Sequence, residues 1–473
     1  MEANASFVAA STINGTAGLH MASLERQLLE IGDIQVIAAL LFCGMMFFFL
    51  LPRERRLELS LFGLAVAQTI ARLVDLGAAA SIAMALIIGF YIAIIASIAF
   101  GGEEGARWND WTWILVLSSG ASIFYVVQAT DAAKAVILRV EWLLLVVSAA
   151  MTAGSVKTQD QLLRVMKAIC LGLGVGCLVC FWPLIDNPAS AISAGFGRFT
   201  PYGANPNQIG ITFAIAAIFG AYIWLRTNDL IPRILCGGAA ALGAALLLLT
   251  VSRMAVLICA VALLPLLPFL LRRPLHAIVL FCVMCGGAYK VVAAVSEASF
   301  DRIDQGLDRS NWWELGYEEF CRRPILGMYG VKDLPAVEID ERDNSHNAYL
   351  SILYLGGLSI GIPIFLCQLR GVIAAIQMSR KCDRTAYDPI LIGILAGCSV
   401  MQVVHGFANE IIYYPTYIWA FWNIFCIVFF TNQLRLKDLR SASSMLPVSQ
   451  NRQTRRSGIP YREFRPVLAR RIS

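Results

Sequence analysis

The sequence predicts an all-α polytopic membrane protein, and three observations support this fold class. First, 58% of the 473 residues are hydrophobic and only 15% are charged, whereas soluble proteins average about 25% charged residues. Second, the mean hydropathy of the whole chain is +0.67. Third, apolar runs near the ~20 residues that a helix needs to cross ~30 Å of hydrocarbon recur along the chain. These features exclude a disordered chain, a nucleic-acid-binding protein and an ordinary cytosolic enzyme.

The apolar runs predict a bundle of about 12–13 transmembrane helices. No ten-residue alternating pattern recurs, so transmembrane β-strands are not expected. Residues 1–33 form a polar N-terminal segment without the basic start and adjoining apolar run of a signal peptide. The thirteen runs lie at residues 34–51, 57–73, 77–98, 112–128, 135–153, 168–185, 209–225, 232–250, 254–271, 275–295, 347–369, 387–408 and 411–432.

The net charge of +6 is distributed unevenly. From residue 433 onward, ten basic and two acidic residues give a charge of +8, which leaves −2 for the rest of the chain. We expect this tail, 433–473, to be disordered and cytoplasmic, because Lys and Arg are enriched on the cytoplasmic side of membrane proteins. Further basic links are predicted to lie on the same side, at 52–56, 157–167, 226–233, 272–273 and 379–384.

Two long links are predicted on the opposite, periplasmic side, at 186–208 and 296–346. The second carries 12 acidic and 6 basic residues, so it is net acidic. We divide the chain into four parts on this basis. They are the polar segment 1–33, a first group of transmembrane helices in 34–185, a transmembrane core in 186–432 that includes the loop 296–346, and the tail 433–473.

The thirteen cysteines do not predict a disulfide framework or a metal site. Most lie within apolar runs. Cys177 with Cys180, and Cys282 with Cys285, have the spacing of metal ligands, but neither pair has a second pair or a histidine in a polar setting. We expect these thiols to pack as small buried hydrophobic groups.

Polar residues gather at two places on the predicted outer face. The stretch 197–207 precedes an apolar run and contains Arg198 and Asn205-Pro206-Asn207, a turn and cap signal from which we expect Asn207 to cap the following helix. The tight hairpin 250–253 carries Arg253 between two spans. An Arg there runs against the positive-inside bias, although an Arg at a membrane edge can extend its head group to water.

A third group lies within the large outer loop. Arg309 precedes two tryptophans and the turn 324–327, and Arg302 is a competing cation. Trp313, Tyr317 and Phe320 have the spacing of one helix face, which favours packing on the membrane surface over stacking on a sugar.

The fourth group is the stretch His346-Asn347-Ala348-Tyr349-Leu350, at the entrance to a span. Histidine exchanges protons near neutral pH, and a helix N-terminus disfavours the charged imidazolium, so His346 is a candidate base. His405, with Glu410 nearby, is a rival. Arginines bind phosphate through paired hydrogen bonds. A diphosphate leaving group held by arginines beside such a base would suit a transfer reaction.

These four groups resemble the O-antigen ligase and O-antigen polymerase superfamily of bacterial envelope glycosyltransferases. The resemblance covers about 190–370. It is carried by the stretch 198–207, by Ser252-Arg253, by Arg309 with the tryptophans and the turn that follow, and most specifically by His346-Asn347-Ala348-Tyr349-Leu350 with the glycines after it.

The resemblance implies a GT-C-type bundle in the bacterial inner membrane that takes glycan from undecaprenyl diphosphate on the periplasmic face. It implies His346 as the base and Arg198, Arg253 and Arg309 as diphosphate ligands. Supporting roles fall on Asn205, Asn207, Asn347 and Tyr349. Members of this superfamily use no cofactor, nucleotide sugar or metal, and the outer loop lacks an Asp-x-Asp pair. Direct displacement would invert the anomeric carbon.

The acceptor decides between several functions. We favour O-antigen ligation to lipid A–core in lipopolysaccharide biosynthesis. The alternatives are a polymerase that joins lipid-linked repeat units of O-antigen or exopolysaccharide, and transfer to protein. A flippase for lipid-linked glycans belongs to a different class. It is disfavoured because transporters carry ionisable residues at mid-membrane, whereas the apolar runs here carry few.

Overall fold

Helices dominate the computed structural model of this chain, which confirms the all-α class for the part it covers. Its only β-type pairing among those residues is an isolated bridge between Ile192 and Phe199. The structure describes residues 55–100, 106–126, 132–193, 197–268, 313–314, 316–318, 320–327, 347–380, 386–409 and 414–445.

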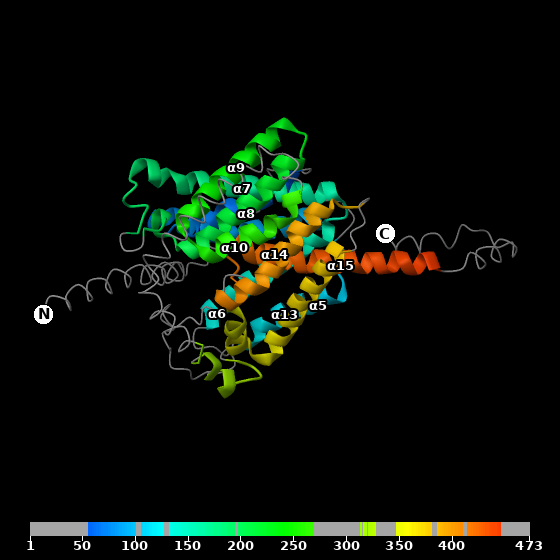
Figure 1. The fold of residues 1–473 in the computed structure, drawn as a ribbon. Helices are drawn as coiled ribbons and strands as arrows, with labels where there is room; N and C mark the ends of the chain where they lie inside the picture. The colour runs from blue at the N-terminus through cyan, green and yellow to red at the C-terminus, as the bar shows by residue number, and fades with distance from the viewer. Residues whose placement is uncertain are drawn as a thin grey trace, which may run out of the picture.

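Each of the longer helices overlaps a predicted apolar run (Figure 1). Some extend well beyond it: the last helix continues to Met445, so the prediction of a disordered tail is wrong for residues 433–445. The longer ones are α3 (Arg56–Ile70), α4 (Ala78–Ala99), α5 (Asp110–Val126), α6 (Ala132–Ser155), α7 (Gln159–Asp186), α8 (Pro206–Arg226), α9 (Leu230–Thr250), α10 (Arg253–Leu263), α13 (Ala348–Arg380), α14 (Pro389–Ala408) and α15 (Ile418–Met445). Short 3₁₀ turns are η2 (Val74–Leu76), η3 (Pro201–Gly203) and η4 (Leu264–Leu266).

Six of the described helices are long and apolar enough to cross a membrane, namely α4, α7, α8, α9, α13 and α14. This supports a multi-pass membrane protein. The predicted spans 34–51 and 275–295 lie outside the described residues, as do the N-terminal segment 1–33 and most of the loop 296–346. The count of 12–13 spans therefore stays a prediction.

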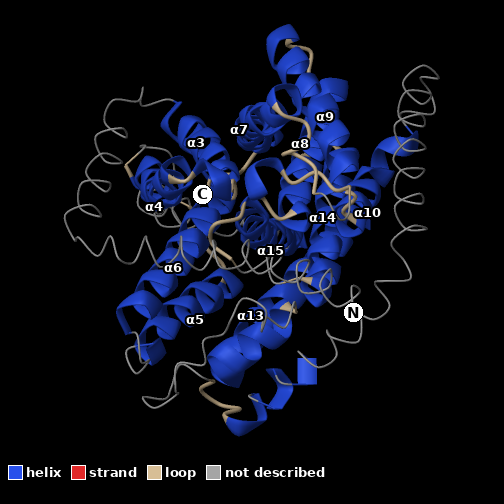
Figure 2. Cartoon of the chain, turned by 90° about the vertical axis from the view of Figure 1, so that its left-hand side faces the viewer, coloured by secondary structure: helices blue, strands red, loops and turns tan. Residues whose placement is uncertain are grey.

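Helix α15 lies at the centre of the bundle. It packs on α3, α5, α6 and α8 and also on α13 and α14, and in Figure 2 its neighbours surround it. Its first four turns are almost fully buried, and the rings of Trp422, Phe425 and Phe429 stack in sequence with centroids 4.5 and 5.9 Å apart. Aromatic side chains bury large apolar areas, so this column forms the middle of the core.

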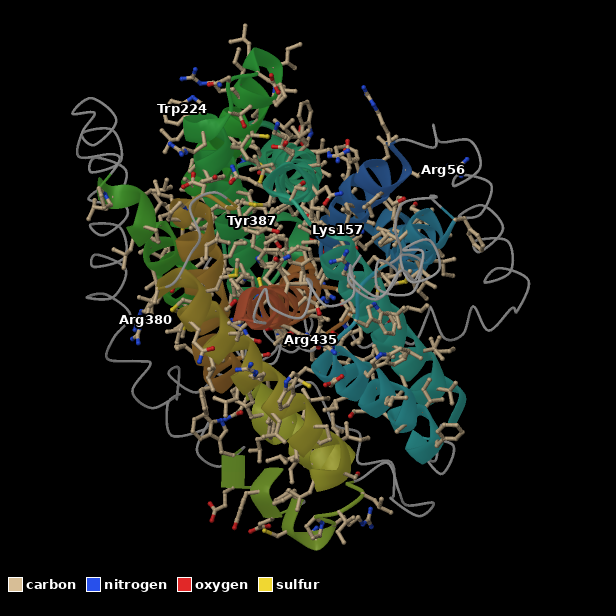
Figure 3. The ribbon with its side chains drawn as sticks, turned by 90° about the vertical axis from the view of Figure 1, so that its right-hand side faces the viewer. Arg56, Lys157, Trp224, Arg380, Tyr387 and Arg435 are labelled. Carbon is tan, nitrogen blue, oxygen red and sulfur yellow. The ribbon has the colours of Figure 1, made fainter. Side chains whose placement is uncertain are left out.

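Four salt bridges connect described residues at one end of the bundle. The most buried is between Arg226 Nε and Asp388 Oδ2, at 2.8 Å, and the hydroxyl of Tyr222 also donates to Asp388, at 3.0 Å. The others are Arg164–Glu58, Lys167–Asp229 and Arg435–Asp110. Their basic residues lie in the predicted cytoplasmic segments 157–167, 226–233 and 433–473. Figure 3 views the molecule from the side toward which α15 extends, with labelled basic residues across it.

One predicted link is shorter than expected. The basic stretch 157–167 is predicted to be a loop, but α7 already begins at Gln159. Thr158 and Gln161 form a capping box in which each side chain accepts a hydrogen bond from the other residue's backbone N–H. Because this pairing satisfies the first donors of the helix, Arg164 and Lys167 lie on helical turns.

Candidate functional site

The side chain of Arg198 is held by two segments that are distant in sequence. Its Nε donates to the backbone carbonyl of Thr250, at 3.0 Å, and its Nη2 donates to Oδ1 of Asn207, at 2.7 Å. The backbone N–H of Phe199 adds a bond to the carbonyl of Leu249, at 3.0 Å. Two bonds from one planar guanidinium fix its orientation, so Arg198 ties the start of α8 to the end of α9.

The expectation that Asn207 caps α8 is wrong. Asn205 is the N-cap, and its Oδ1 accepts the backbone N–H of Asn207, at 3.0 Å. Pro206 is the first helical residue, where its missing N–H costs nothing and its fixed φ suits the helix. The cap therefore falls one residue before the proline, and the Asn207 side chain accepts the hydrogen bond from Arg198 instead.

Backbone strain is concentrated beside Arg198. Within the described ranges, the non-glycine residues with positive φ are Tyr202, at 48°, and Val251, at 52°. Tyr202 lies in η3, and Val251 ends α9 directly after Thr250. A β-branched residue in this region is a genuine outlier, and such strain clusters at functional sites. The loop and the hairpin that carry the predicted arginines are therefore held in unusual conformations.

Arg253 lies in the same region. It is the first residue of α10, follows the N-cap Ser252, and is exposed. Helix α8 approaches the hairpin closely, because a Cβ added to Gly210 would lie 3.1 Å from both Ser252 Cβ and Thr250 Oγ1. The structure thus brings Arg198, Asn205, Asn207 and the hairpin of Arg253 together at the meeting point of α8, α9 and α10.

Asn347 and Tyr349 have structural roles at the start of α13. Oδ1 of Asn347 accepts the backbone N–H groups of Tyr349 and Leu350, at 3.0 and 3.1 Å, as an N-cap does. The hydroxyl of Tyr349 donates to the carbonyl of Val403 on α14, at 2.9 Å. These bonds fix the first turn of α13, the turn that directly follows His346.

The two groups belong to different parts of the bundle. Among the described helices, α13 packs on α5, α14 and α15, whereas α8 packs on α7, α9, α10 and α15. His346, Arg309, Arg302 and Glu410 lie outside the described residues. Their distances from Arg198 therefore stay predictions.

The predicted turn 324–327 docks on a break in α13. Gly357 has φ 63° and ψ −171°, which interrupts the helix. The backbone N–H groups that follow the break, those of Leu358 and Ser359, donate to the carbonyls of Pro324 and Ile325, at 2.7 and 3.1 Å. The turn satisfies the backbone donors that the break at Gly357 exposes. The turn and the break therefore stabilise each other.

We expect Gly357→Ala to be strongly destabilising. An added Cβ would lie 2.2 Å from the carbonyl oxygen of Ile325, and the positive φ disfavours any side chain. We expect a loss of about 3 kcal/mol, measured by thermal unfolding of the purified protein in detergent. Gly238→Ala is the matched control, because nothing lies within 4 Å of its added Cβ. Equal stability of the two variants would contradict the docked arrangement.

His405 is buried in the bundle. Its side chain is 2% exposed, its ring meets the edge of Trp419, and its Nδ1 has no hydrogen-bond partner among the described residues. An acceptor hydroxyl could reach this ring only if α14 and α15 separated. The burial therefore favours a packing role for His405 over the rival catalytic role.

Sequence reasoning missed Arg72. This side chain is 9% exposed, and its guanidinium lies 3.6 Å above the ring of Tyr417. Beside it, Gln68 Nε2 and the hydroxyl of Tyr91 both donate to the carbonyl of Pro415. The available signal was a charge near the end of an apolar run, which marks functional positions in membrane proteins.

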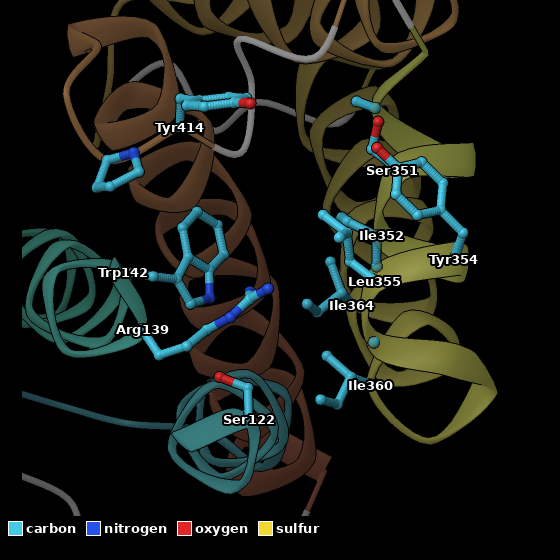
Figure 4. Close-up of a pocket in the computed structure, with 13 residues that line it drawn as sticks. Ser122, Arg139, Trp142, Ser351, Ile352, Tyr354, Leu355, Ile360, Ile364 and Tyr414 are labelled. Carbon is cyan, nitrogen blue, oxygen red and sulfur yellow. The ribbon is translucent and has the colours of Figure 1, made fainter. Parts of the chain in front are cut away.

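Sequence reasoning also missed a cavity of about 160 Å³ between α6 and α13 (Figure 4). Arg139 and Trp142 line one side, Ser351 and Tyr354 line the other, and Tyr414 lies at one end. The guanidinium of Arg139 reaches from α6 into the space between the helices. Ala348, in the first turn of α13, also lines it.

The prediction that Cys177 and Cys180 pack in the core is confirmed, because both are free thiols buried within α7. The pair Cys282 and Cys285 lies outside the described residues. Across the described ranges, no group of three or more His, Cys, Asp or Glu side chains could hold a metal ion.

No protein-family model matches this chain, and no curated protein matches it either.

Proposed function

We propose that this protein is a membrane glycosyltransferase that transfers glycan from undecaprenyl diphosphate to an acceptor hydroxyl, and that the reaction is O-antigen ligation to lipid A–core. The observation that carries the proposal is the fixed guanidinium of Arg198. Two of its hydrogen bonds go to oxygen atoms of Thr250 and Asn207, within a strained loop beside the hairpin of Arg253. Oriented arginines of this kind suit a phosphate ligand.

In the proposed reaction, Arg198, Arg253 and Arg309 hold the diphosphate of the donor. His346 accepts the proton of the acceptor hydroxyl, whose oxygen forms a bond to the anomeric carbon. The bond from that carbon to the phosphate oxygen breaks, and undecaprenyl diphosphate leaves with the electron pair. The arginines stabilise the negative charge that develops on this leaving group, and the reaction inverts the anomeric carbon.

The charge distribution supports a membrane orientation for this reaction. Basic residues and salt bridges gather at the end of the bundle that contains Arg226 and Arg435. Arg198 lies at the opposite end, beside the start of α8 and the end of α9. Because positive residues favour the cytoplasmic side, we propose that the Arg198 end faces the periplasm and that the C-terminus is cytoplasmic. The protein would then lie in the bacterial inner membrane.

Movement of a lipid-linked glycan between leaflets is the second candidate function. Two observations favour it: the break in α13 at Gly357 and the buried Arg72. Broken helices and buried ionisable residues are common in transporters. The docking of the turn 324–327 on the break argues for a fixed structure, since it satisfies the N–H groups of Leu358 and Ser359.

Reconstitution of the full chain into liposomes tests these functions. The donor is an undecaprenyl-diphosphate-linked glycan, offered with either lipid A–core or a second lipid-linked unit. We expect glycan-capped lipid A–core, detected by gel mobility and mass spectrometry. A lengthened lipid-linked chain would overturn ligation in favour of polymerisation. Donor movement between leaflets without any product would overturn the transferase proposal.

A further inference from the structure

The cavity between α6 and α13 lies along the first half of α13, toward the end of the bundle opposite the salt bridges. After the break at Gly357, α13 continues to Arg380. At about 1.5 Å per residue, this part alone is long enough to cross roughly 30 Å of hydrocarbon. The cavity is lined from Ala348, before this break, to Ile364, after it, so it reaches from the predicted outer end of the span into its first half.

The size of the cavity suits a single six-membered ring. Its volume is about 160 Å³, close to the roughly 150 Å³ of an engineered cavity that accepts benzene. Trp142, Tyr354 and Tyr414 provide aromatic surfaces, and Ser351 provides a hydroxyl group. Aromatic walls with a few placed polar groups are typical of small-molecule sites.

The walls are held in place by polar contacts outside the cavity. The indole Nε1 of Trp142 donates to Oγ of Ser119, at 3.1 Å. On the neighbouring wall, the carbonyl of Pro415 accepts hydrogen bonds from Gln68 and Tyr91. Because these contacts fix the rings before a ligand arrives, less ordering entropy is lost on binding.

Arg139 is the charged side chain among the residues that line the cavity. The guanidinium of Arg139 extends into it, as Figure 4 shows. Ala348 places the first turn of α13 on the cavity wall, and a helix N-terminus carries a partial positive charge. An apolar cavity strengthens both effects because its dielectric constant is low.

We propose that this cavity binds a sugar of the acceptor glycan that carries a carboxylate or phosphate group, with Arg139 pairing with that group. The proposal rests on the proposed transferase function. The predicted base, His346, precedes Ala348 by two residues, so base and acceptor subsite adjoin along the chain. In this scheme the donor diphosphate binds elsewhere, at Arg198, which precedes α8, and at Arg253, on α10.

The test compares binding of two probes, glucuronic acid and glucose, to the full chain in lipid nanodiscs, measured by saturation-transfer-difference NMR titration. We expect glucuronic acid to bind about tenfold more tightly, as one charge-assisted bond allows. Arg139→Gln removes this preference, Arg139→Lys keeps part of it, and Arg435→Gln at the other end keeps all of it. Equal binding of both sugars, or a preference that survives Arg139→Gln, overturns the cavity proposal.

A second arm separates this proposal from the proposed function. Arg198→Ala is expected to lose transfer in the liposome assay while it keeps the preference for glucuronic acid. Transfer by the wild type without any preference for glucuronic acid would overturn the cavity proposal and leave the transferase standing. A preference without transfer by the wild type would overturn the transferase and, with it, the acceptor role of the cavity.

Discussion

Replacing His346 by Ala is expected to abolish glycan transfer while the protein stays folded and inserted in the membrane. A general base contributes about 10²–10⁴-fold to the rate of a reaction. Asn347, the next residue, satisfies the first N–H groups of α13 through its side chain. Loss of the imidazole therefore leaves the cap of the helix intact, and the effect should fall on chemistry.

The measurement is product formation in the liposome assay, together with gel filtration and thermal unfolding of the same preparation. His20→Ala, in the N-terminal segment, is the matched control and should keep full transfer. A pH series adds a readout that a structural role would not produce. Transfer by the wild type should fall at acidic pH, because a general base must be neutral to accept the proton of the acceptor hydroxyl. Full activity of His346→Ala would overturn the assignment.

Arg198→Ala is expected to lower transfer by about 10²–10³-fold, the range found when one donor to a developing negative charge is removed. Hydrogen bonds to Thr250 and Asn207, at 3.0 and 2.7 Å, orient the guanidinium. Lysine carries a single ammonium group and cannot reproduce this fork. Arg198→Lys should therefore recover only part of the activity.

The control for this variant is Arg164→Ala. Arg164 pairs with Glu58 at 3.8 Å and is half exposed at the other end of the bundle. Surface pairs of this kind contribute about 0–1 kcal/mol, so the control should keep both its stability and its activity. If Arg198→Ala retained wild-type transfer, the diphosphate role would be wrong. If its activity fell only in proportion to an unfolded fraction, Arg198 would be a structural tie between α8 and α9.

The positions of the helices follow closely from local sequence. The run 77–98 corresponds to α4, the run 232–250 corresponds to α9, and the hairpin 250–253 separates α9 from α10 as expected. Hydrophobicity is a property of each segment by itself, and in a bilayer a helix satisfies its own backbone hydrogen bonds. The sequence was therefore sufficient to predict these spans without knowledge of their neighbours.

The apolar pattern predicted the ends of helices less accurately than their positions. The pattern Asn205-Pro206-Asn207 contains two possible caps, and the choice depended on the proline between them. The start of α7 depended on the capping box of Thr158 and Gln161. Both signals are local, so closer attention to capping chemistry would have located both ends.

Local sequence was sufficient to predict the all-α class, the helices that overlap apolar runs and the residues to test, because apolar length and scarce polar groups are visible along the chain. The contacts of those residues, in contrast, depend on how the helices pack together. The bond from Arg198 to Thr250, the docking of the turn 324–327 on Gly357, the burial of Arg72 and the cavity beside Arg139 each join distant segments. Contacts of this kind depend on how helices pack, and helix packing is set by the shapes of two surfaces at once.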